Sequence, residues 1–167
     1  MDMGKSILLL NTALADELQA VHQYLYFHFH LDDQGFKPLA QLFKRIAIQE
    51  MGHVEALADR ILFLKGDVEM KAAGPVEKIV EAEAILEKAM AMEQESARFY
   101  NQSALDAGAN ADSATKHLFE ELVRQEEGHF DQFEKQADNI KRFGPSYLAL
   151  QSFGQGGMQA STASATE

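Results

Sequence analysis

Two short stretches, Glu50-Met51-Gly52-His53 and Glu126-Glu127-Gly128-His129, each hold a glutamate three residues before a histidine. On an α-helix these two side chains project from one face, about 60° apart, within reach of a single metal ion. One such pair also arises by chance, or as a hydrogen-bonded pair along a helix face. Two copies in one chain predict a pair of metal-binding helices.

The composition favours a single all-α domain. The chain has 167 residues, of which 46% are hydrophobic and 25% charged, with only three prolines. That length suffices for one substantial core but hardly for two. The sequence has no cysteine, which excludes disulfides, thiolate zinc sites and cysteine-ligated iron centres. Any metal must therefore be held by carboxylates and imidazoles.

The net charge of −11 disfavours one class of partner and suits another. Nucleic-acid affinity comes mainly from Lys and Arg neutralising phosphates, so we expect no nucleic acid and a cation instead. The apolar run from Ile7 to Leu10 is too short for a signal peptide before Asn11 interrupts it. No apolar run is long enough to span a bilayer. We expect a cytoplasmic protein with no membrane partner.

Four segments carry apolar residues at alternating three- and four-residue steps, a pattern typical of amphipathic helices. We expect these helices over about 5–30, 38–65, 80–107 and 113–142, with a short fifth helix over 146–153. The connection over 66–80 contains Gly66, Gly74 and Pro75, and its length favours a crossover along a bundle. Residues 1–153 are predicted to form one domain, and residues 154–167 a disordered tail rich in Gly, Ser, Thr and Ala.

Six ionisable residues lie on the apolar faces of the four predicted helices. Burying them is costly unless they are paired or coordinate a metal. The six are Glu17, Glu50, His53, Glu93, Glu126 and His129. Glu17 precedes Glu50 by 33 residues, as Glu93 precedes Glu126, so the two halves repeat at an offset of 76. Tyr24 falls on Tyr100 at the same offset.

The repeat also predicts where these side chains meet. In an antiparallel hairpin, residues equidistant from the turn lie at one height, because each helix rises about 1.5 Å per residue. The midpoints of the two Glu–Glu pairs fall at 33–34 and at 109–110, both in predicted turns. We therefore expect four carboxylates and two imidazoles to converge in the core; the alternative is a set of unrelated polar groups, each with its own local partner.

Four carboxylates would repel one another in a dry core unless about four positive charges lay between them. Two divalent cations supply that charge. Oxygen-rich ligation with one imidazole per metal suits iron or manganese, and zinc in vitro.

This arrangement resembles the ferritin-like di-iron proteins, and several stretches are similar to bacterioferritins over nearly all of residues 5–150. The matching stretches are Asp16-Glu17-Leu18 with Gln23-Tyr24, Ile48 to His53, Arg60 to Leu64, and Glu126 to Phe130. The resemblance implies a ferritin-like four-helix bundle with a fifth helix, and dimers that assemble into a hollow 24-mer cage. It implies a ferroxidase that oxidises Fe(II) with O2 or H2O2 for storage as a ferric mineral, and a ferredoxin-type reductase for iron release.

The resemblance also assigns residue roles by position. The six ionisable residues would bind two iron ions per subunit, with Glu50 and Glu126 as bridges and Glu17 and Glu93 as terminal ligands. Tyr24 would contact these ligands without binding iron, and a plain core tyrosine remains its alternative, as it does for Tyr100.

Met51 matches the family's ligand for haem b, one from each subunit at the dimer interface. It follows Glu50 and so lies about 100° round the helix, facing away from the iron site. An ordinary interface contact is the alternative role of Met51. Gly52 marks either the close approach of another group or a tight helix contact.

Some positions depart from the family pattern or have no assigned role. Arg45 and Gln49 stand where some relatives place a His and an Asp on the inner cage wall, so we expect no interior iron relay of that kind. His22, His28 and His30 are interpreted as helix-end and packing groups.

Rival functions remain open. One is a haem-bearing or structural cage whose metal site does not turn over. Another is a DNA-coating mini-ferritin, which the acidic charge disfavours. A rubrerythrin-like peroxidase would normally add an iron domain with cysteine ligands, which this sequence lacks.

Overall fold

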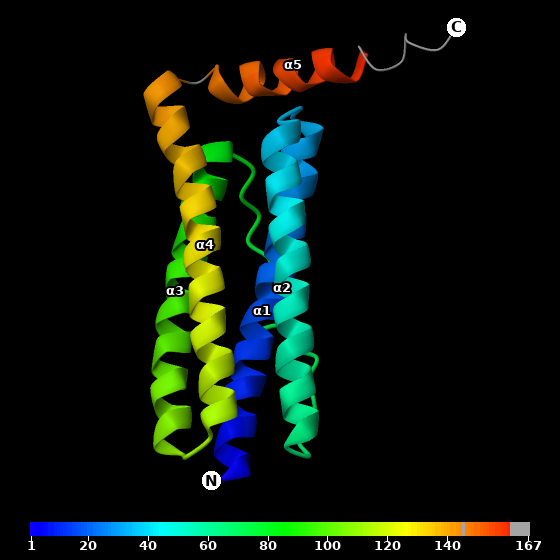
Figure 1. The fold of residues 1–167 in the computed structure, drawn as a ribbon. Coiled ribbons are helices and arrows are strands. Elements are labelled where there is room, and N and C mark those ends of the chain that lie inside the picture. The colour runs from blue at the N-terminus through cyan, green and yellow to red at the C-terminus, as the bar shows by residue number, and fades with distance from the viewer. Residues whose placement is uncertain (145, 161–167) are drawn as a thin grey trace, which may run out of the picture.

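Four long antiparallel helices form a bundle, and a fifth helix lies across one end of it (Figure 1). The computed structural model describes residues 1–144 and 146–160, and for 155–160 the backbone alone. The helices are α1 (Met3–Asp33), α2 (Lys37–Phe63), α3 (Ala82–Ala109), α4 (Ser113–Phe143) and α5 (Tyr147–Ala160). The predicted all-α bundle, with its long second connection and short fifth helix, is confirmed.

The fifth helix runs further than the sequence predicted. It continues from Tyr147 through Gly154 to Ala160, so the predicted disordered tail falls partly on α5. Glycine in a helix interior costs only about 1 kcal/mol relative to alanine, so a glycine-rich composition does not by itself end a helix. Residues 161–167 lie outside the described residues.

The apolar core divides into two clusters along the bundle. One includes Phe27, Phe43 and Phe133, towards the α5 end. The other includes Leu14 and Phe119, towards the N-terminal end of α1. The polar residues that the sequence singled out lie between these two clusters, near the middle of the helices.

The end of α2 depends on two neighbouring residues rather than on glycine alone. Lys65 takes the left-handed conformation (φ 64°), and the Gly66 N–H donates to the Ile61 carbonyl at 3.0 Å. A Cβ at Gly66 would come within 2.9 Å of Ile7 on α1. Gly66 therefore follows the helix end as predicted. A glycine is required at this position because α1 approaches too closely for a side chain.

Three amide side chains on α1 hold the crossover between α2 and α3. In Asn11, Gln19 and Gln23 the NH2 group donates to a crossover carbonyl and the C=O group accepts from a crossover N–H, at 2.7–3.0 Å. We call these the amide pairs. The crossover residues contacted are Asp67, Glu69, Gly74, Pro75 and Glu77. The amide pairs fix the crossover along α1.

A buried polar network joins three helices at the end of the bundle opposite α5. Asp112, the N-cap of α4, accepts from the Ser6 hydroxyl at 2.7 Å and from Arg60 Nη2 at 2.6 Å. The Thr115 hydroxyl donates to Asp112 at 2.7 Å and accepts from Arg60 Nε at 2.9 Å. We call Ser6, Arg60, Asp112 and Thr115 the end cluster. Its one carboxylate is neutralised by its own cation.

Within the described residues, no helix combines the length and the apolar character needed to cross a membrane.

Candidate metal centre

The structure brings together all six ionisable residues that the sequence singled out. They come from all four helices of the bundle, and each is only 1–4% exposed. They are Glu17 on α1, Glu50 and His53 on α2, Glu93 on α3, and Glu126 and His129 on α4. The alternative of six unrelated polar groups is therefore wrong. Their role as metal ligands remains a prediction.

The ligand atoms fall into two overlapping sets. Each set holds three carboxylates and one imidazole, whose atoms lie within 4.8 Å of one another. The two sets are Glu17, Glu50, His53 and Glu126, and Glu50, Glu93, Glu126 and His129. Glu50 and Glu126 belong to both, as bridging carboxylates between two adjacent metals would. The arrangement is that of a buried dinuclear site.

The imidazole of His53 turns its Nδ1 atom towards the carboxylates of the first set. This atom lies 2.8 Å from Glu50 Oε2, 3.1 Å from Glu126 Oε1 and 3.2 Å from Glu17 Oε1. Three carboxylate oxygens thus surround one ring nitrogen. Nδ1 is therefore the atom of His53 that would bind a cation held by this set.

The imidazole of His129 is turned in the same way. Its Nδ1 atom lies 3.1 Å from Glu50 Oε1, 3.4 Å from Glu126 Oε2 and 3.5 Å from Glu93 Oε2. The rings of His53 and His129 are nearly parallel, with centroids 5.7 Å apart and an interplanar angle of 21°. The two halves of the site thus present the same ring atom to the shared carboxylates.

Three buried atoms of this site have no hydrogen-bond partner within the described part of the chain. They are Glu50 Oε2, Glu126 Oε1 and His129 Nδ1. Glu50 Oε2 and Glu126 Oε1 lie close to His53 Nδ1, but without hydrogen-bonding geometry. Unsatisfied buried polar atoms are rare in folded proteins, and three of the five such side-chain atoms among the described residues belong to the two ligand sets. Carboxylate oxygens and imidazole nitrogens are suitable ligands for iron, so the residues present fit a metal pair.

The protein's own cationic side chains neutralise these carboxylates poorly. Burial raises the pKa of Glu17, and the nearby charge of Glu50 raises it further. Burial likewise raises the pKa of Glu93. Among the described residues, no lysine or arginine pairs with any of these carboxylates, and only imidazoles do. The site therefore favours uptake of positive charge.

Protons supply part of that charge when no metal is bound. Burial opposes protonation of His129, but the nearby carboxylates of Glu126 and Glu50 outweigh it and raise the pKa of His129 to about 12. The same balance raises the pKa of His53 well above its usual range. Burial also opposes ionisation of Glu126, but its close contacts with Glu93 and both imidazoles hold the pKa of Glu126 below its usual range. Divalent cations must displace these protons when they bind.

Two buried tyrosines support the site symmetrically. The Tyr24 hydroxyl on α1 donates to Glu93 Oε1 on α3, and the Tyr100 hydroxyl on α3 donates to Glu17 Oε1 on α1. Each tyrosine thus reaches across the bundle to a carboxylate on the facing helix. Tyr100, which the sequence left open, contacts the site as Tyr24 does.

Sequence reasoning missed Gln125. His53 Nε2 lies 2.8 Å from Gln125 Oε1, on the ring edge opposite the carboxylates. The one sequence feature that pointed to Gln125 is that it directly precedes Glu126 on α4. A glutamine next to a candidate ligand belongs to no recognisable motif, so Gln125 could not be distinguished from a surface residue.

Met51 lies apart from the dinuclear site, on the outer surface of α2. It is 49% exposed, and its neighbour Ile48 is exposed as well. A Cβ added at Gly52 would meet nothing within 4 Å. A tight helix contact within this subunit therefore does not explain Gly52, and the surface around Met51 is open to a group from outside.

The unassigned histidines have separate, local surroundings. His28 is buried, with its Nδ1 atom 2.9 Å from the Ala40 carbonyl. The His30 ring packs against Tyr26, with centroids 4.3 Å apart and the two rings tilted by 48°. His22 is exposed. None of the three belongs to the two ligand sets.

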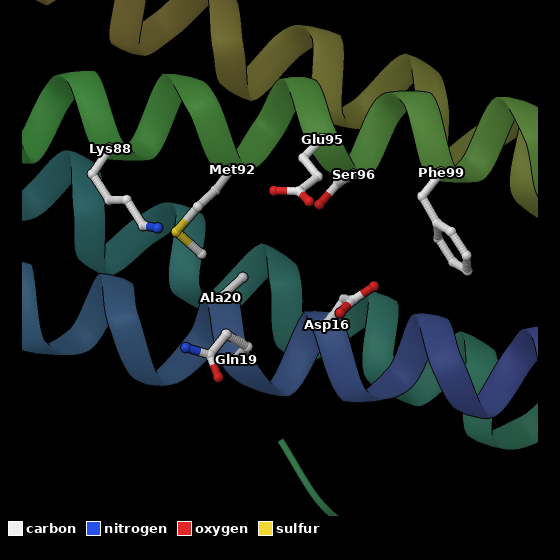
Figure 2. Close-up of a pocket in the computed structure, with 8 residues that line it drawn as sticks. All are labelled: Asp16, Gln19, Ala20, Lys88, Met92, Glu95, Ser96 and Phe99. Carbon is white, nitrogen blue, oxygen red and sulfur yellow. The ribbon is translucent and has the colours of Figure 1, made fainter. Parts of the chain in front are cut away.

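A pocket of about 250 Å³ opens between α1 and α3. Figure 2 shows the carboxylates of Asp16 and Glu95 directed into it from the two helices. Burial raises the pKa of Asp16, and the charge of Glu95 raises it further. Asp16 is the neighbour of Glu17 in the chain, but none of the six clustered residues lines this pocket. The pocket is thus distinct from the dinuclear site.

Comparisons with known proteins agree with this architecture. The model of the ferritin-like domain matches residues 7–143. Bacterioferritin from Desulfovibrio desulfuricans is 36% identical, over 87% of this chain and 82% of its own. Bacterioferritin from Rhodobacter capsulatus is 35% identical, over 88% of this chain and 91% of its own.

Two solved structures are similar over most of their length. The Rhodobacter capsulatus bacterioferritin, described with a metal-free dinuclear site and a haem iron in a crystallographic special position, has a TM-score of 0.86 and 32% identity, covering 91% of this chain and 94% of its own. The Desulfovibrio desulfuricans bacterioferritin, described with its di-iron site in different catalytic states, has a TM-score of 0.86 and 35% identity, covering 88% and 86%. With its fold, its buried Glu/His site and these relatives, the chain belongs to the bacterioferritins of the ferritin-like family.

Proposed function

We propose that this chain is a cytoplasmic iron-storage protein whose dinuclear site is a ferroxidase. It would oxidise Fe(II) with O2 or H2O2 and release the ferric product into a hollow cage of identical subunits. The observation that supports this most is the pair of ligand sets that share Glu50 and Glu126. Glu50 and Glu126 would serve both metal positions, so that two iron ions could react as a pair.

The paired arrangement suits a two-electron reduction. Two Fe(II) ions supply the two electrons that convert H2O2 to two water molecules, or O2 to H2O2, with uptake of two protons in either case. Carboxylate oxygens favour the ferric product, while each imidazole fixes one iron of the pair. All six residues would bind iron, and His53 and His129 would each serve one position.

Tyr24 and Tyr100 would orient the terminal ligands Glu93 and Glu17 through their hydrogen bonds. Both hydroxyls keep their protons, because burial and the neighbouring carboxylates raise the pKa of each tyrosine well above its usual value. They therefore act as donors and leave the remaining carboxylate oxygens free for iron.

Stopped-flow oxidation of Fe(II) tests this function. The wild type should show a rapid phase saturating near two Fe(II) per subunit. Glu126→Ala, which removes a shared ligand, should abolish that phase while far-UV circular dichroism stays unchanged. A variant that oxidises Fe(II) at the wild-type rate would contradict the site assignment.

The alternative is a structural or haem-bearing cage whose metal pair stays in place without turnover. A wild type that binds two metals but shows no rapid phase would favour it.

We further propose that Met51 binds haem b at a twofold interface, one methionine from each subunit. The thioether is a suitable haem ligand, and the Met51 side chain is exposed on a surface with neighbouring apolar residues. Haem added to the metal-free protein should give a bis-methionine spectrum that Met51→Leu abolishes. Met70→Leu, at an exposed methionine of the crossover, is the matched control and should retain the spectrum.

Assembly into dimers and a 24-mer cage would bury exposed apolar side chains that a lone subunit leaves in water. Leu62, Phe63 and Phe153 are prominent among these. Light scattering after size exclusion measures the assembly directly, and a monomer at micromolar concentration would contradict the cage. A ferredoxin-type reductase is the partner proposed for iron release.

A further inference from the structure

The dinuclear site is nearly symmetric, and one side chain breaks the symmetry. The offset of 76 residues relates His53 to His129 and Tyr24 to Tyr100, and each related pair makes corresponding contacts. Gln125 is the exception. It contacts the outer ring nitrogen of His53, and no corresponding contact to His129 occurs among the described residues.

A chain of hydrogen bonds fixes the direction of this contact. Arg124 Nη2 donates to Glu121 Oε1 at 2.5 Å, and the same oxygen accepts from Gln125 Nε2 at 3.2 Å. A carboxylate beside an arginine only accepts, so the NH2 group of Gln125 must face Glu121. Its carbonyl oxygen therefore faces His53, and His53 Nε2 must donate to it. In neutral His53 the lone pair then lies on Nδ1, the atom that faces the carboxylates.

The other half of the site lacks this support for a reason visible in the sequence. At the offset of 76, Gln125 corresponds to Gln49 and Glu121 corresponds to Arg45. Arginine only donates, so it cannot accept from the amide NH2 as Glu121 does. Gln49 is exposed, and its side chain makes no hydrogen bond among the described residues to His129 Nε2. His129 is held from the carboxylate side alone.

We propose that Gln125 is a positioning residue that makes the two metal positions unequal. The His53 position binds its metal more tightly, and the His129 position is the one that exchanges. A hydrogen bond to the outer nitrogen of a metal-binding histidine sets its tautomer and orientation, and its loss typically weakens metal affinity by about 10–100-fold. This inference rests on the proposed function, because it requires that the site bind two metals.

Titration of the metal-free full-length protein with Co(II) alone measures the inequality. Calorimetry of the wild type should resolve two binding steps per subunit, separated by about 10–100-fold in affinity. Crystals given one Co(II) per subunit should show the stronger anomalous peak beside His53. Both readouts are independent of iron oxidation.

Two variants and one control test the role of Gln125. Gln125→Leu should weaken the tighter step by about 10–100-fold and divide the anomalous peak between the two positions. Glu121→Lys replaces the acceptor at position 121 with a donor, as Arg45 is at the corresponding position of the other half. It should weaken the same binding step although Gln125 itself is kept. Gln49→Leu is the matched control, and both of its binding steps should equal those of the wild type. Thermal melts of each metal-free variant confirm folding.

The outcomes separate this inference from the function beneath it. If the wild type binds two Co(II) and either Gln125→Leu or Glu121→Lys leaves the tighter step unchanged, the role of Gln125 is wrong while the dinuclear site stands. If two equal steps are found in the wild type, the inequality is wrong. A wild type that binds fewer than two Co(II) overturns the proposed function and this inference together.

Discussion

The end cluster and the dinuclear site bury carboxylates equally well but neutralise them differently. Asp112 is 2% exposed and accepts from Ser6, Thr115 and Arg60, so its charge is matched within the protein. The dinuclear site buries four carboxylates as deeply, with two imidazoles and, among the described residues, no lysine or arginine. A buried cluster with its own cation stabilises the fold. A cluster without one is suited to a cation from outside.

The pKa directions in the two clusters reflect this contrast. Burial opposes ionisation of Asp112, but the hydroxyls of Thr115 and Ser6 and the charge of Arg60 outweigh it and lower its pKa. In the dinuclear site burial prevails for Glu17, whose pKa is raised. The same substitution, carboxylate to amide, should therefore have opposite consequences in the two places.

Of the two carboxylate-to-amide substitutions, Glu17→Gln should have the larger effect on activity. The amide keeps the size of the side chain and its ability to accept from Tyr100, but it removes the charge that we propose binds a cation. Loss of a partner that only orients a ligand costs about 10–100-fold, so loss of a ligand should slow rapid Fe(II) oxidation by about 100-fold or more. Stopped-flow absorbance measures it. The stability of the metal-free protein should change by less than about 1 kcal/mol, because burial already favours the neutral form of Glu17.

Asp112→Asn should do the reverse. The substitution leaves the Arg60 charge unpaired. Because a hydrogen bond to a charged group contributes about 1.5–3 kcal/mol, we expect the free energy of unfolding to fall by about 2–3 kcal/mol. Denaturant unfolding of the metal-free protein measures this loss, and the rate of Fe(II) oxidation should be retained. Equal destabilisation by Glu17→Gln and Asp112→Asn would contradict the contrast between the two clusters.

Metal should change how the stability of the protein depends on pH. In the metal-free fold the pKa of His129 is raised from 6.5 to about 12, so the folded state keeps a proton that the unfolded chain loses. This stabilisation is complete below pH 6.5 and is lost as pH rises towards 12, by at most about 1.4 kcal/mol per pH unit for one group. The raised pKa of Glu17 acts in the same direction from a lower pH.

Thermal melts between pH 6.5 and 8.5 check this dependence. The metal-free protein should lose stability across the range, whereas a divalent metal at 100 times its Kd should add about 2.7 kcal/mol. The metal effect should grow with pH, because fewer protons then have to be displaced. Metal-free and metal-loaded curves that run parallel would be inconsistent with protons and metals competing for one site.

The two tyrosines should give the smallest effects. Tyr24→Phe and Tyr100→Phe each remove one hydrogen bond to a terminal carboxylate, worth about 0.5–1.5 kcal/mol. Oxidation should slow several-fold and about equally in both variants, because the two contacts correspond at the offset of 76. Paired stopped-flow traces test this, and complete loss of the rapid phase in only one variant would show that its tyrosine does more than orient a carboxylate.

The convergence of the six residues could be predicted because it depends on helix periodicity and on distance from a turn, both of which sequence spacing records. Glu17 and Glu93 were identifiable because a carboxylate on an apolar face is conspicuous. Gln125 was not, since its role depends on which way an amide is turned, and that is set by Glu121 and Arg124. The extent of α5 was underestimated because glycine-rich sequence lowers helix stability without forbidding a helix.

The amide pairs on α1 have a consequence for how this protein can vary. Asn11, Gln19 and Gln23 bind peptide groups of the crossover, and a peptide group is the same whatever side chain follows it. Most substitutions between residues 67 and 77 should therefore be neutral, except proline at Glu69, Ala73, Gly74 or Glu77, whose N–H groups donate to α1. Insertions should be tolerated poorly, because the three amides lie at fixed positions on α1 and bind crossover residues at a matching spacing. The sequence of α1 thus determines the path of the crossover. A crossover with an unrelated sequence would follow the same path wherever these three amides are kept.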